Sequence, residues 1–266
     1  MRVRFGDRHV CDKCRKDAHF YRVAKRRSYA CEHCGAQVYP TAGTPFHRTR
    51  TSLRDWFYVM FMFCSTRNGV AAKEVERQIS VTYKTAWRMC HEIRKYMAAV
   101  DGDAPLGGAG EIVEVDETFM GGYDKGGYGG KGKTVVLGMR GRGGDVILRV
   151  APNRTMATLM PHIAANVLAG SEVHTDEFNG YNAIPFGPYT QKSINHSAKQ
   201  YVCCDTGTTV NSIEGFWAQL KQSINGTHIH VSAKQLPKYL GEFGFRHNWR
   251  NHPEMMLSEL MLSFPR

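Results

Sequence analysis

The sequence predicts a multidomain protein in which a small β module and a helical module precede a larger mixed α/β sheet flanked by helices. Four cysteines lie in two close pairs near the start, helical periodicity dominates the next segment, and strand-like segments follow a glycine-rich linker. The predicted boundaries are 1–46 for the β module, 47–100 for the helical module, 101–110 for the linker and 111–266 for the sheet domain.

Composition places the chain among folded soluble proteins. Of its 266 residues, 42% are hydrophobic and 22% are charged. The most apolar run, at 56–64, is too short to span a bilayer. The first residues, MRVRFGDRHVC, lack the apolar core of a signal peptide. We therefore expect a soluble, intracellular protein.

Positive charge is concentrated at one end of the sequence. Residues 1–100 hold 20 Lys and Arg against 8 Asp and Glu, whereas residues 101–266 hold 15 against 16. This asymmetry predicts that the first part faces a polyanion such as DNA. The alternative is a basic surface that serves solubility alone.

The cysteine pairs predict a structural zinc site. Their pattern is C-x2-C-x16-C-x2-C, formed by Cys11, Cys14, Cys31 and Cys34. Two thiolates in each tight turn complete a closed tetrahedral site, which leaves no open position for catalysis. Between the pairs, Lys25, Arg26 and Arg27 lie near aromatic residues, a combination that suits contact with phosphates.

The helical segment predicts a helix-turn-helix. Helical patterns at 51–64, 71–79 and 82–100 are separated by short breaks. In the last helix the predicted buried stripe is Ala86, Cys90, Ile93 and Met97. The residues left outside at its N-terminal end, where a recognition helix touches bases, are Thr82, Lys84, Thr85 and Arg88. A plain three-helix packing unit is the alternative.

Beyond the linker, strand patterns precede further helices. Strands are predicted at 111–119, 134–141, 145–151 and 171–178, with a helix at 155–169 between the third and the fourth. This order favours a mixed sheet with helices packed against it.

Three acids in this region have unusual positions. Asp116 lies inside the first strand, Asp176 near the end of the fourth, and Glu214 in the helix that begins NSIEGFW. Each has a structural alternative: strand-edge solvation, a turn cap, and a capping box with Asn211 as the N-cap, respectively. Lys221 follows Glu214 by two helical turns, so both side chains can serve one site.

Together these motifs resemble the DDE transposases of bacterial insertion sequences, in the branch with an N-terminal zinc ribbon. The similar stretches include VEVDET, HTDEFNGY and NSIEGFWAQLK, and the resemblance covers nearly the whole chain. It implies an RNase H-like core with Asp116, Asp176 and Glu214 as the DDE triad, and Lys221 in contact with DNA. Such carboxylates hold two Mg²⁺ or Mn²⁺ ions about 4 Å apart.

The resemblance also implies how the protein acts in its host. A transposase of this kind binds terminal inverted repeats and target DNA as a homodimer or larger assembly, in the cytoplasm at the nucleoid. Two alternatives stay open: a domesticated regulator that binds DNA without catalysis, and an RNase H-like nuclease that cuts without strand transfer. The sequence does not reveal the repeat sequence or the target preference.

Overall fold

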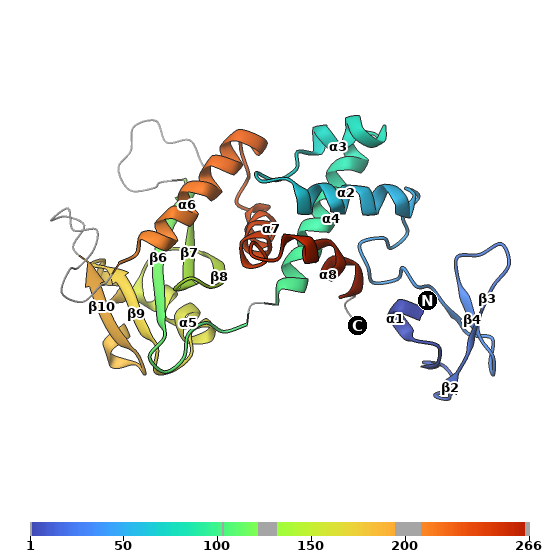
Figure 1. Ribbon diagram of the computed structural model, residues 1–266, viewed down its shortest axis with the longest axis horizontal. Coiled ribbons are helices and arrows are strands. Elements are labelled where there is room, and N and C mark those ends of the chain that lie inside the picture. Colours follow the sequence, from blue (N-terminus) through green and yellow to red (C-terminus); the bar gives the residue numbers. More distant parts are fainter. Residues whose placement is uncertain (1, 103, 122–131, 195–208, 264–266) are drawn as a thin grey trace.

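The computed structural model describes residues 2–102, 104–121, 132–194 and 209–263. Figure 1 shows an elongated molecule with three parts along its long axis. The cysteine-rich strands lie at one end, a group of helices lies in the middle, and a sheet covered by helices forms the other end. None of the described helices combines the length and the apolar character needed to cross a membrane.

The N-terminal module is built from short elements around its cysteines. These elements are α1 (Arg2–Phe5), β1 (His9–Val10), β2 (Asp17–Ala18), β3 (Phe20–Arg22), β4 (Tyr29–Cys31) and β5 (Gln37–Val38). β1 pairs with β2, and β3, β4 and β5 form a separate antiparallel sheet. The small core contains Cys11, Ala18 and Cys31, so two of its buried residues are cysteines of the predicted zinc site.

Three helices occupy the predicted positions in the helical module. They are α2 (Leu53–Ser65), α3 (Ala72–Ile79) and α4 (Tyr83–Asp101). Ser52 caps α2 by accepting from the Asp55 N–H, and Thr82 caps α4 by accepting from the Thr85 N–H. Ser80 takes a left-handed conformation with φ 52° between α3 and α4. The four residues of the predicted buried stripe on α4 are all buried.

The C-terminal sheet is five-stranded and mixed. Its strands are β6 (Ile112–Met120), β7 (Thr134–Gly141), β8 (Val146–Ala151), β9 (Glu172–Asp176) and β10 (Thr190–Ile194). The order across the sheet is β10-β9-β6-β7-β8. β6, β7 and β8 are antiparallel, while β9 runs parallel to both β6 and β10. The predicted fold class, a small β module and helices followed by a mixed sheet with flanking helices, is confirmed.

Helices cover both faces of this sheet, as the alternation along β7 requires. α5 (Met156–Asn166) shares a core with Val135, Leu137 and Met139, whereas α6 (Asn211–Ser223) packs on Val136. Gly138 lies on the α6 face, where a Cβ would come within 2.4 Å of the Trp217 ring. Glycine at this position therefore lets α6 approach the middle of the sheet closely.

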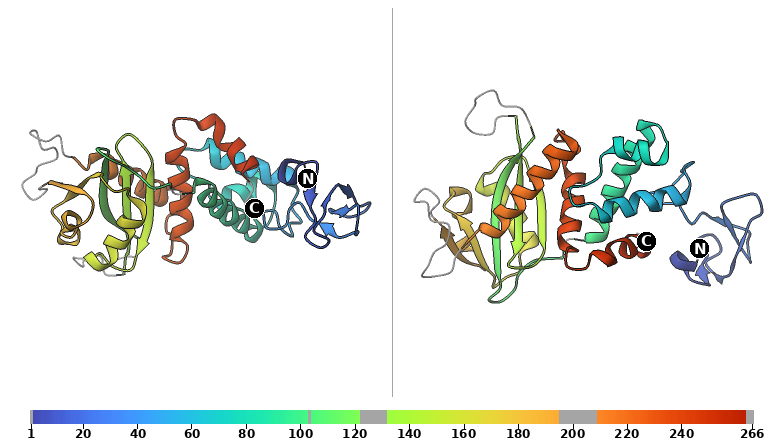
Figure 2. Two further views of the ribbon diagram at one scale, coloured as in Figure 1. Left: turned by 90° about the horizontal axis from the view of Figure 1, so that it is seen from below. Right: turned by 45° about the horizontal axis from the view of Figure 1, so that its top comes forward.

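The last helices connect the sheet domain to the helical module. α6 continues into a π-helical turn, η4 (Ile224–His228), and is followed by α7 (Leu236–Asn248) and α8 (Met256–Leu262). α7 packs on both α4 and β8, and Figure 2 shows it between the sheet and helices α2–α4. Phe245, Met256 and Leu260 belong to the core that α2–α4 form. The helical module and the last helices of the chain thus share one hydrophobic core. The predicted domain boundaries stay a prediction.

Candidate active site and metal centres

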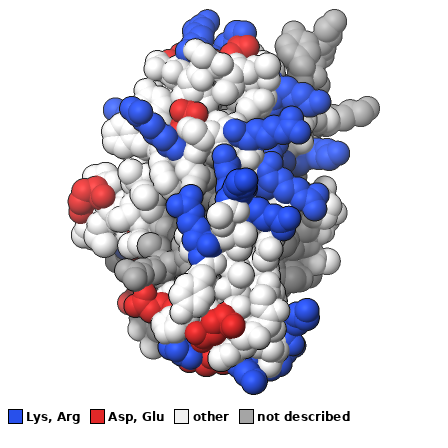
Figure 3. All heavy atoms as spheres, turned by 90° about the vertical axis from the view of Figure 1, so that its right-hand side faces the viewer, with Lys and Arg blue, Asp and Glu red and all other residues white. Residues whose placement is uncertain are grey.

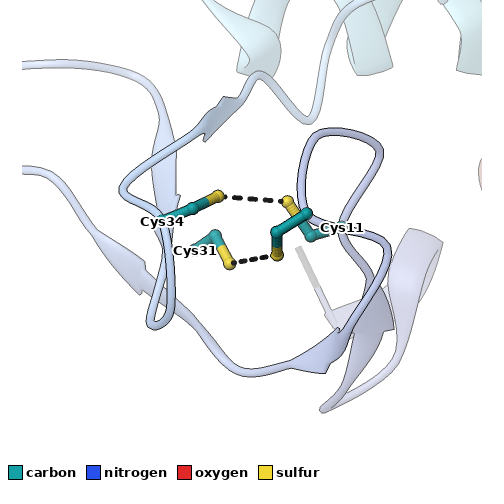
Figure 4. Close-up of side chains that lie close together, drawn as sticks. Cys11, Cys31 and Cys34 are labelled. Carbon is teal, nitrogen blue, oxygen red and sulfur yellow. Dashed lines mark hydrogen bonds between the residues drawn. The ribbon is translucent and has the colours of Figure 1, made fainter.

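The four N-terminal cysteines form a site that fits zinc. Their sulfurs all lie within 4.8 Å of one another, with Cys11 Sγ 3.6 Å from Cys34 Sγ and Cys14 Sγ 3.9 Å from Cys31 Sγ. Tetrahedral zinc with bonds of about 2.3 Å separates its sulfur ligands by about 3.8 Å, so the spacing matches. Figure 4 shows the sulfurs of Cys11, Cys31 and Cys34 converging on one small volume. The backbone N–H of Cys14 is the main group that lowers the pKa of Cys11, to about 6, which favours the thiolate that a metal requires.

Two equivalent turns present these sulfurs. Arg15 N–H donates to Cys11 O and Gly35 N–H donates to Cys31 O, at 2.8 and 3.0 Å. Arg15 and Gly35 both adopt positive φ, at 58° and 69°. The same backbone conformation therefore follows each C-x2-C pair, which explains how two short turns produce one tetrahedral set.

Strand register brings Asp116 and Asp176 together. In the parallel pairing of β6 with β9, Ile112 is opposite Glu172 and Glu114 is opposite His174. Continuing this register by two residues places Asp116 level with Asp176 on the same face of the sheet. Asp176 ends β9, and its Oδ1 accepts from the Phe178 N–H at 3.0 Å, which orients the carboxylate at the strand end.

Asp116 carries the electrostatic signature of an acid beside other acids. Burial, the largest cause, and the charges of Glu117 and Asp176 together raise its pKa to about 7. The indole N–H of Trp217 opposes this shift by donating to Asp116 Oδ2 at 2.9 Å. The site thus gathers negative charge that a bound cation would neutralise.

Trp217 also identifies the face of α6 that points toward Asp116. Glu214 precedes Trp217 by three residues and Lys221 follows it by four, so all three belong to one stripe of the helix. The pKa of Lys221 is lowered, mainly by partial burial and also by the charge of Lys133. The charge of Asp116 opposes this shift. Figure 1 shows α6 crossing the sheet, with its first turn near the end of β9.

The N-terminus of α6 is capped differently from the prediction. α6 begins at Asn211 itself, Val210 occupies the cap position, and no side chain of the cap residue bonds the helix. Instead the buried carboxylate of Glu114 accepts from the Ile213 N–H at 3.0 Å. Asn211 as N-cap was therefore wrong, because a carboxylate from the neighbouring strand satisfies the helix end.

The three acids do not form a compact set of ligand atoms. Among the described residues, the cysteines are the sole group of three or more ligating side chains whose donor atoms lie within 4.8 Å of one another. Asp116 and Asp176 are coupled through their charges, and Glu214 lies exposed in the first turn of the helix above them. The role of Glu214 accordingly stays a prediction.

Glu117, the residue after Asp116, points to the opposite face of the sheet, which α5 covers. Glu117 accepts from the Tyr181 hydroxyl, and Arg154 Nη1 lies 3.6 Å from its Oε1. Tyr181 is fully buried, and the Arg154 guanidinium lies 4.5 Å from the centre of the Phe178 ring. Glu117 is thus held by partners that also pack the chain after Asp176, a role that strand alternation could have indicated.

The predicted DNA-contacting residues fall on a basic, hollowed surface. Arg26 and Arg27 line a cavity of about 870 Å³ together with Arg22 and Arg48, between the N-terminal strands and the start of α2. Arg22 and Arg48 were missed, because they lie outside the cluster that stood out in the sequence. Lys25 is exposed but does not line the cavity.

The predicted DNA-contacting residues of α4 lie outside this cavity. Thr82, Lys84 and Arg88 are exposed and Thr85 is half-buried, while Thr82 also serves as the helix cap. Figure 3 views the molecule from the N-terminal end and shows Lys and Arg gathered across this face, with few acidic side chains among them.

Comparison with known proteins agrees with the fold and the motifs. The ISXO2-like transposase domain matches residues 106–248, more than half of the chain, and the transposase zinc-ribbon domain matches residues 1–37. An uncharacterized transposase-like protein of Haemophilus influenzae is 31% identical over 102 residues, which are 37% of this chain and 77% of that protein. A crystal structure of a pre-cleavage Mos1 transpososome is 10% identical with a TM-score of 0.29, over 82% of this chain and 80% of that one. The matched domains include both the cysteine site and the acid-bearing sheet, and the chain belongs to the family of transposases with an ISXO2-like domain.

Proposed function

We propose that this transposase cleaves DNA at the ends of an insertion sequence and joins the freed ends to target DNA, using Asp116, Asp176 and Glu214 as a DDE triad. The observation that carries the proposal is that Asp116 on β6 lies close enough to Asp176, at the end of β9, for their charges to interact, on the side of the sheet covered by the helix that bears Glu214. The raised pKa of Asp116 supports it, because uncompensated negative charge at a strand end suits cation binding.

The donor set fits Mg²⁺ or Mn²⁺. All three residues offer hard carboxylate oxygens, which these ions prefer, and Asp116 is only partly buried, which leaves access for water and phosphate. Asp116, Asp176 and Glu214 are the residues that would hold these ions. When bound, such ions lower the pKa of attacking water and stabilise charge on the leaving oxygen.

The protein's own groups position the reactants. The indole of Trp217 holds one oxygen of Asp116, which leaves the other directed to a ligand. Lys221, on the same stripe of α6, contacts the DNA phosphates beside the cleaved bond. Water first attacks the phosphorus at the element end and displaces the 3′-oxygen of the element, which leaves as a 3′-OH. This 3′-OH then attacks a phosphorus of the target strand and displaces the 3′-oxygen of the adjacent target nucleotide.

DNA recognition falls to the N-terminal modules. We propose that the zinc ribbon, through Lys25, Arg26 and Arg27, follows the phosphates of the terminal inverted repeat. α3 and α4 act as a helix-turn-helix, in which Thr82, Lys84, Thr85 and Arg88 meet base edges and adjacent phosphates. Two ends must be joined in one reaction, so the protein works as a homodimer or larger assembly on DNA, at the nucleoid.

The test compares cleavage by the wild type and by Glu214→Gln on DNA that carries the repeats flanking this gene. Glu254, whose side chain is 68% exposed near the C-terminus, provides the matched control Glu254→Gln. We expect Mg²⁺-dependent cleavage and strand transfer by the wild type and the control, and binding without either reaction by Glu214→Gln. Cleavage without transfer by the wild type would indicate a nuclease, and binding without cleavage would indicate a regulator. Equal cleavage by Glu214→Gln would remove this residue from the triad.

A further inference from the structure

The turn after α6 holds an apolar residue in a strained conformation. Ile229 has φ 62° and ψ −56°, and the N–H of His230 donates to the carbonyl of His228 at 2.6 Å across it. This is the rare form of the γ-turn, and a β-branched residue adopts it only at a cost of about 1–3 kcal/mol. The cost of this strain must therefore be offset by packing in the fold or retained because the residue has a function.

Packing does not offset this cost. The Ile229 side chain is 84% exposed, and among the described large apolar side chains only Phe186 is more exposed. Glycine would take the same backbone conformation without strain. An isoleucine that is both strained and exposed does not stabilise the fold, which indicates that its side chain has a role in binding.

A cavity of about 240 Å³ lies next to this turn. Its apolar walls include Phe119, Ile224 and Val231, and its cationic or titratable groups are Lys133, Lys221 and His230. Among the described residues that line it, none is acidic. The volume is below the roughly 300 Å³ at which pockets for drug-sized ligands begin, so it suits a single planar ring system.

The cavity adjoins the candidate active site. Lys221 lines the cavity and lies close enough to Asp116 for the charge of Asp116 to act on its pKa. The Ile229 turn is held against the end of β6, because a Cβ on Gly121 would lie 3.2 Å from the carbonyl of Val231. A ligand in the cavity would therefore lie beside the DNA phosphate that the acids act on.

We propose that this cavity receives one unstacked DNA base next to the cleaved phosphate, and that Ile229 takes the place of that base in the stack. The inference rests on the proposed cleavage function. An apolar wall suits the base, while Lys133 and Lys221 suit the phosphates on either side of it. Apolar side chains that insert between base steps offset an unstacking cost of a few kcal/mol.

The experiment uses full-length protein and element-end duplexes with 2-aminopurine at single positions around the cleaved bond. In complexes formed with Ca²⁺, which supports binding without turnover, we expect fluorescence to rise several-fold at one position. Ile229→Gly removes the side chain and relieves the strain, so it should fold at least as well as the wild type. It should lose the fluorescence rise and cleave about tenfold more slowly with Mg²⁺. Phe186→Ala is the matched control and should behave as the wild type does.

An abasic substrate provides a second readout. Removing the base at the bright position abolishes the unstacking cost, so Ile229→Gly should cleave this substrate as fast as the wild type does. The inference is overturned if the wild type cleaves while every 2-aminopurine stays stacked, or if Ile229→Gly matches the wild type in fluorescence and rate on the intact duplex. Failure of the proposed function looks different: the wild type would then cleave no end DNA in Mg²⁺.

Discussion

The protein holds buried or partly buried charge in two regions, and it treats that charge in opposite ways. At the contact of α4 with α7, Glu242 lies between two arginines, 2.7 Å from Arg94 Nε and 3.3 Å from Arg246 Nη1. At the sheet, Asp116 lies near Asp176, and near Glu117 on the opposite face of the same strand, and both of these acids share its sign. In the first region the carboxylate is paired with cations of the chain itself, whereas in the second the repulsion between carboxylates is relieved by a proton or a cation.

This difference separates structural charge from functional charge. Arg94 also donates to the carbonyl of Val70 at 2.9 Å and lies 4.1 Å from the centre of the Tyr239 ring. Every group in that cluster fixes the helical module to α7. Asp116 and Asp176 instead accept from the uncharged N–H groups of Trp217 and Phe178, which leave their negative charge available to a metal ion.

The largest expected effect is on catalysis. Asp116→Asn keeps an acceptor for the Trp217 indole but removes the charge that would bind metal. We expect Mg²⁺-dependent cleavage to fall about a thousandfold, corresponding to several kcal/mol of transition-state stabilisation.

The same variant should not be less stable than the wild type in metal-free protein. The pKa of Asp116 is higher in the folded state than in the unfolded state, so its contribution to stability is complete below pH 4 and is lost as pH rises to about 7. Thermal melts should show a smaller decline over this range for Asp116→Asn. An equal decline in both proteins would contradict the raised pKa.

Removing the charge of Glu242, which pairs with Arg94 and Arg246, should affect stability more than any change at the acid site. Glu242→Gln leaves Arg94 buried, with its side chain only 2% exposed and without a counter-charge. We expect a loss of about 3–5 kcal/mol in the free energy of unfolding, measured by urea denaturation. The exposed control Glu254→Gln should change it by less than about 0.5 kcal/mol. A loss near zero for Glu242→Gln would show that the cluster is not structural.

Removing the cap of α6 should have an intermediate effect, on both stability and cleavage. Glu114→Ala removes the acceptor of the Ile213 N–H and should cost about 1–2 kcal/mol. Cleavage should fall with it, because Glu214 lies in the turn that this contact holds. Glu114→Gln keeps an acceptor oxygen and should restore most of both properties; if it is as defective as Glu114→Ala, charge rather than capping explains the effect.

The smallest expected effect concerns pH. Burial, the main cause, and the charge of Arg94 together lower the pKa of His228 to about 4. A folded-state pKa below the unfolded value of about 6.5 gives stability that is present above pH 6.5 and lost as pH falls toward 4. The melting temperature should therefore decline in this range, and less so in His228→Gln. The Asp116 region has the opposite dependence, so one pH series distinguishes the two.

Local patterns were sufficient to predict much of this molecule. The cysteine spacing predicted a site whose sulfurs do converge, because the two C-x2-C turns need only their own backbone geometry. The helices predicted at 51–64 and 82–100 begin within two residues of the predicted positions, and Ser52 and Thr82 cap them. Asp116 and Asp176 were singled out because acids at strand interiors and strand ends are unusual.

Contacts between distant segments could not be predicted in the same way. Glu114 caps a helix that begins almost a hundred residues later, and nothing near Asn211 indicates this. Likewise, Arg94 and Glu242 look like ordinary surface charges of amphipathic helices until the helices pack together. The addition of α7 and α8 to the core of α2–α4 follows from the same tertiary packing.

The central claim is that Asp116, Asp176 and Glu214 form a divalent-metal site, and metal binding tests it most directly. Mn²⁺ binding can be followed by electron paramagnetic resonance at pH 8, with zinc retained in the ribbon, for the wild type, Asp176→Asn and Glu254→Gln. The account predicts that the wild type and Glu254→Gln bind Mn²⁺ and that Asp176→Asn binds at least tenfold more weakly. Equal binding by all three proteins would contradict it.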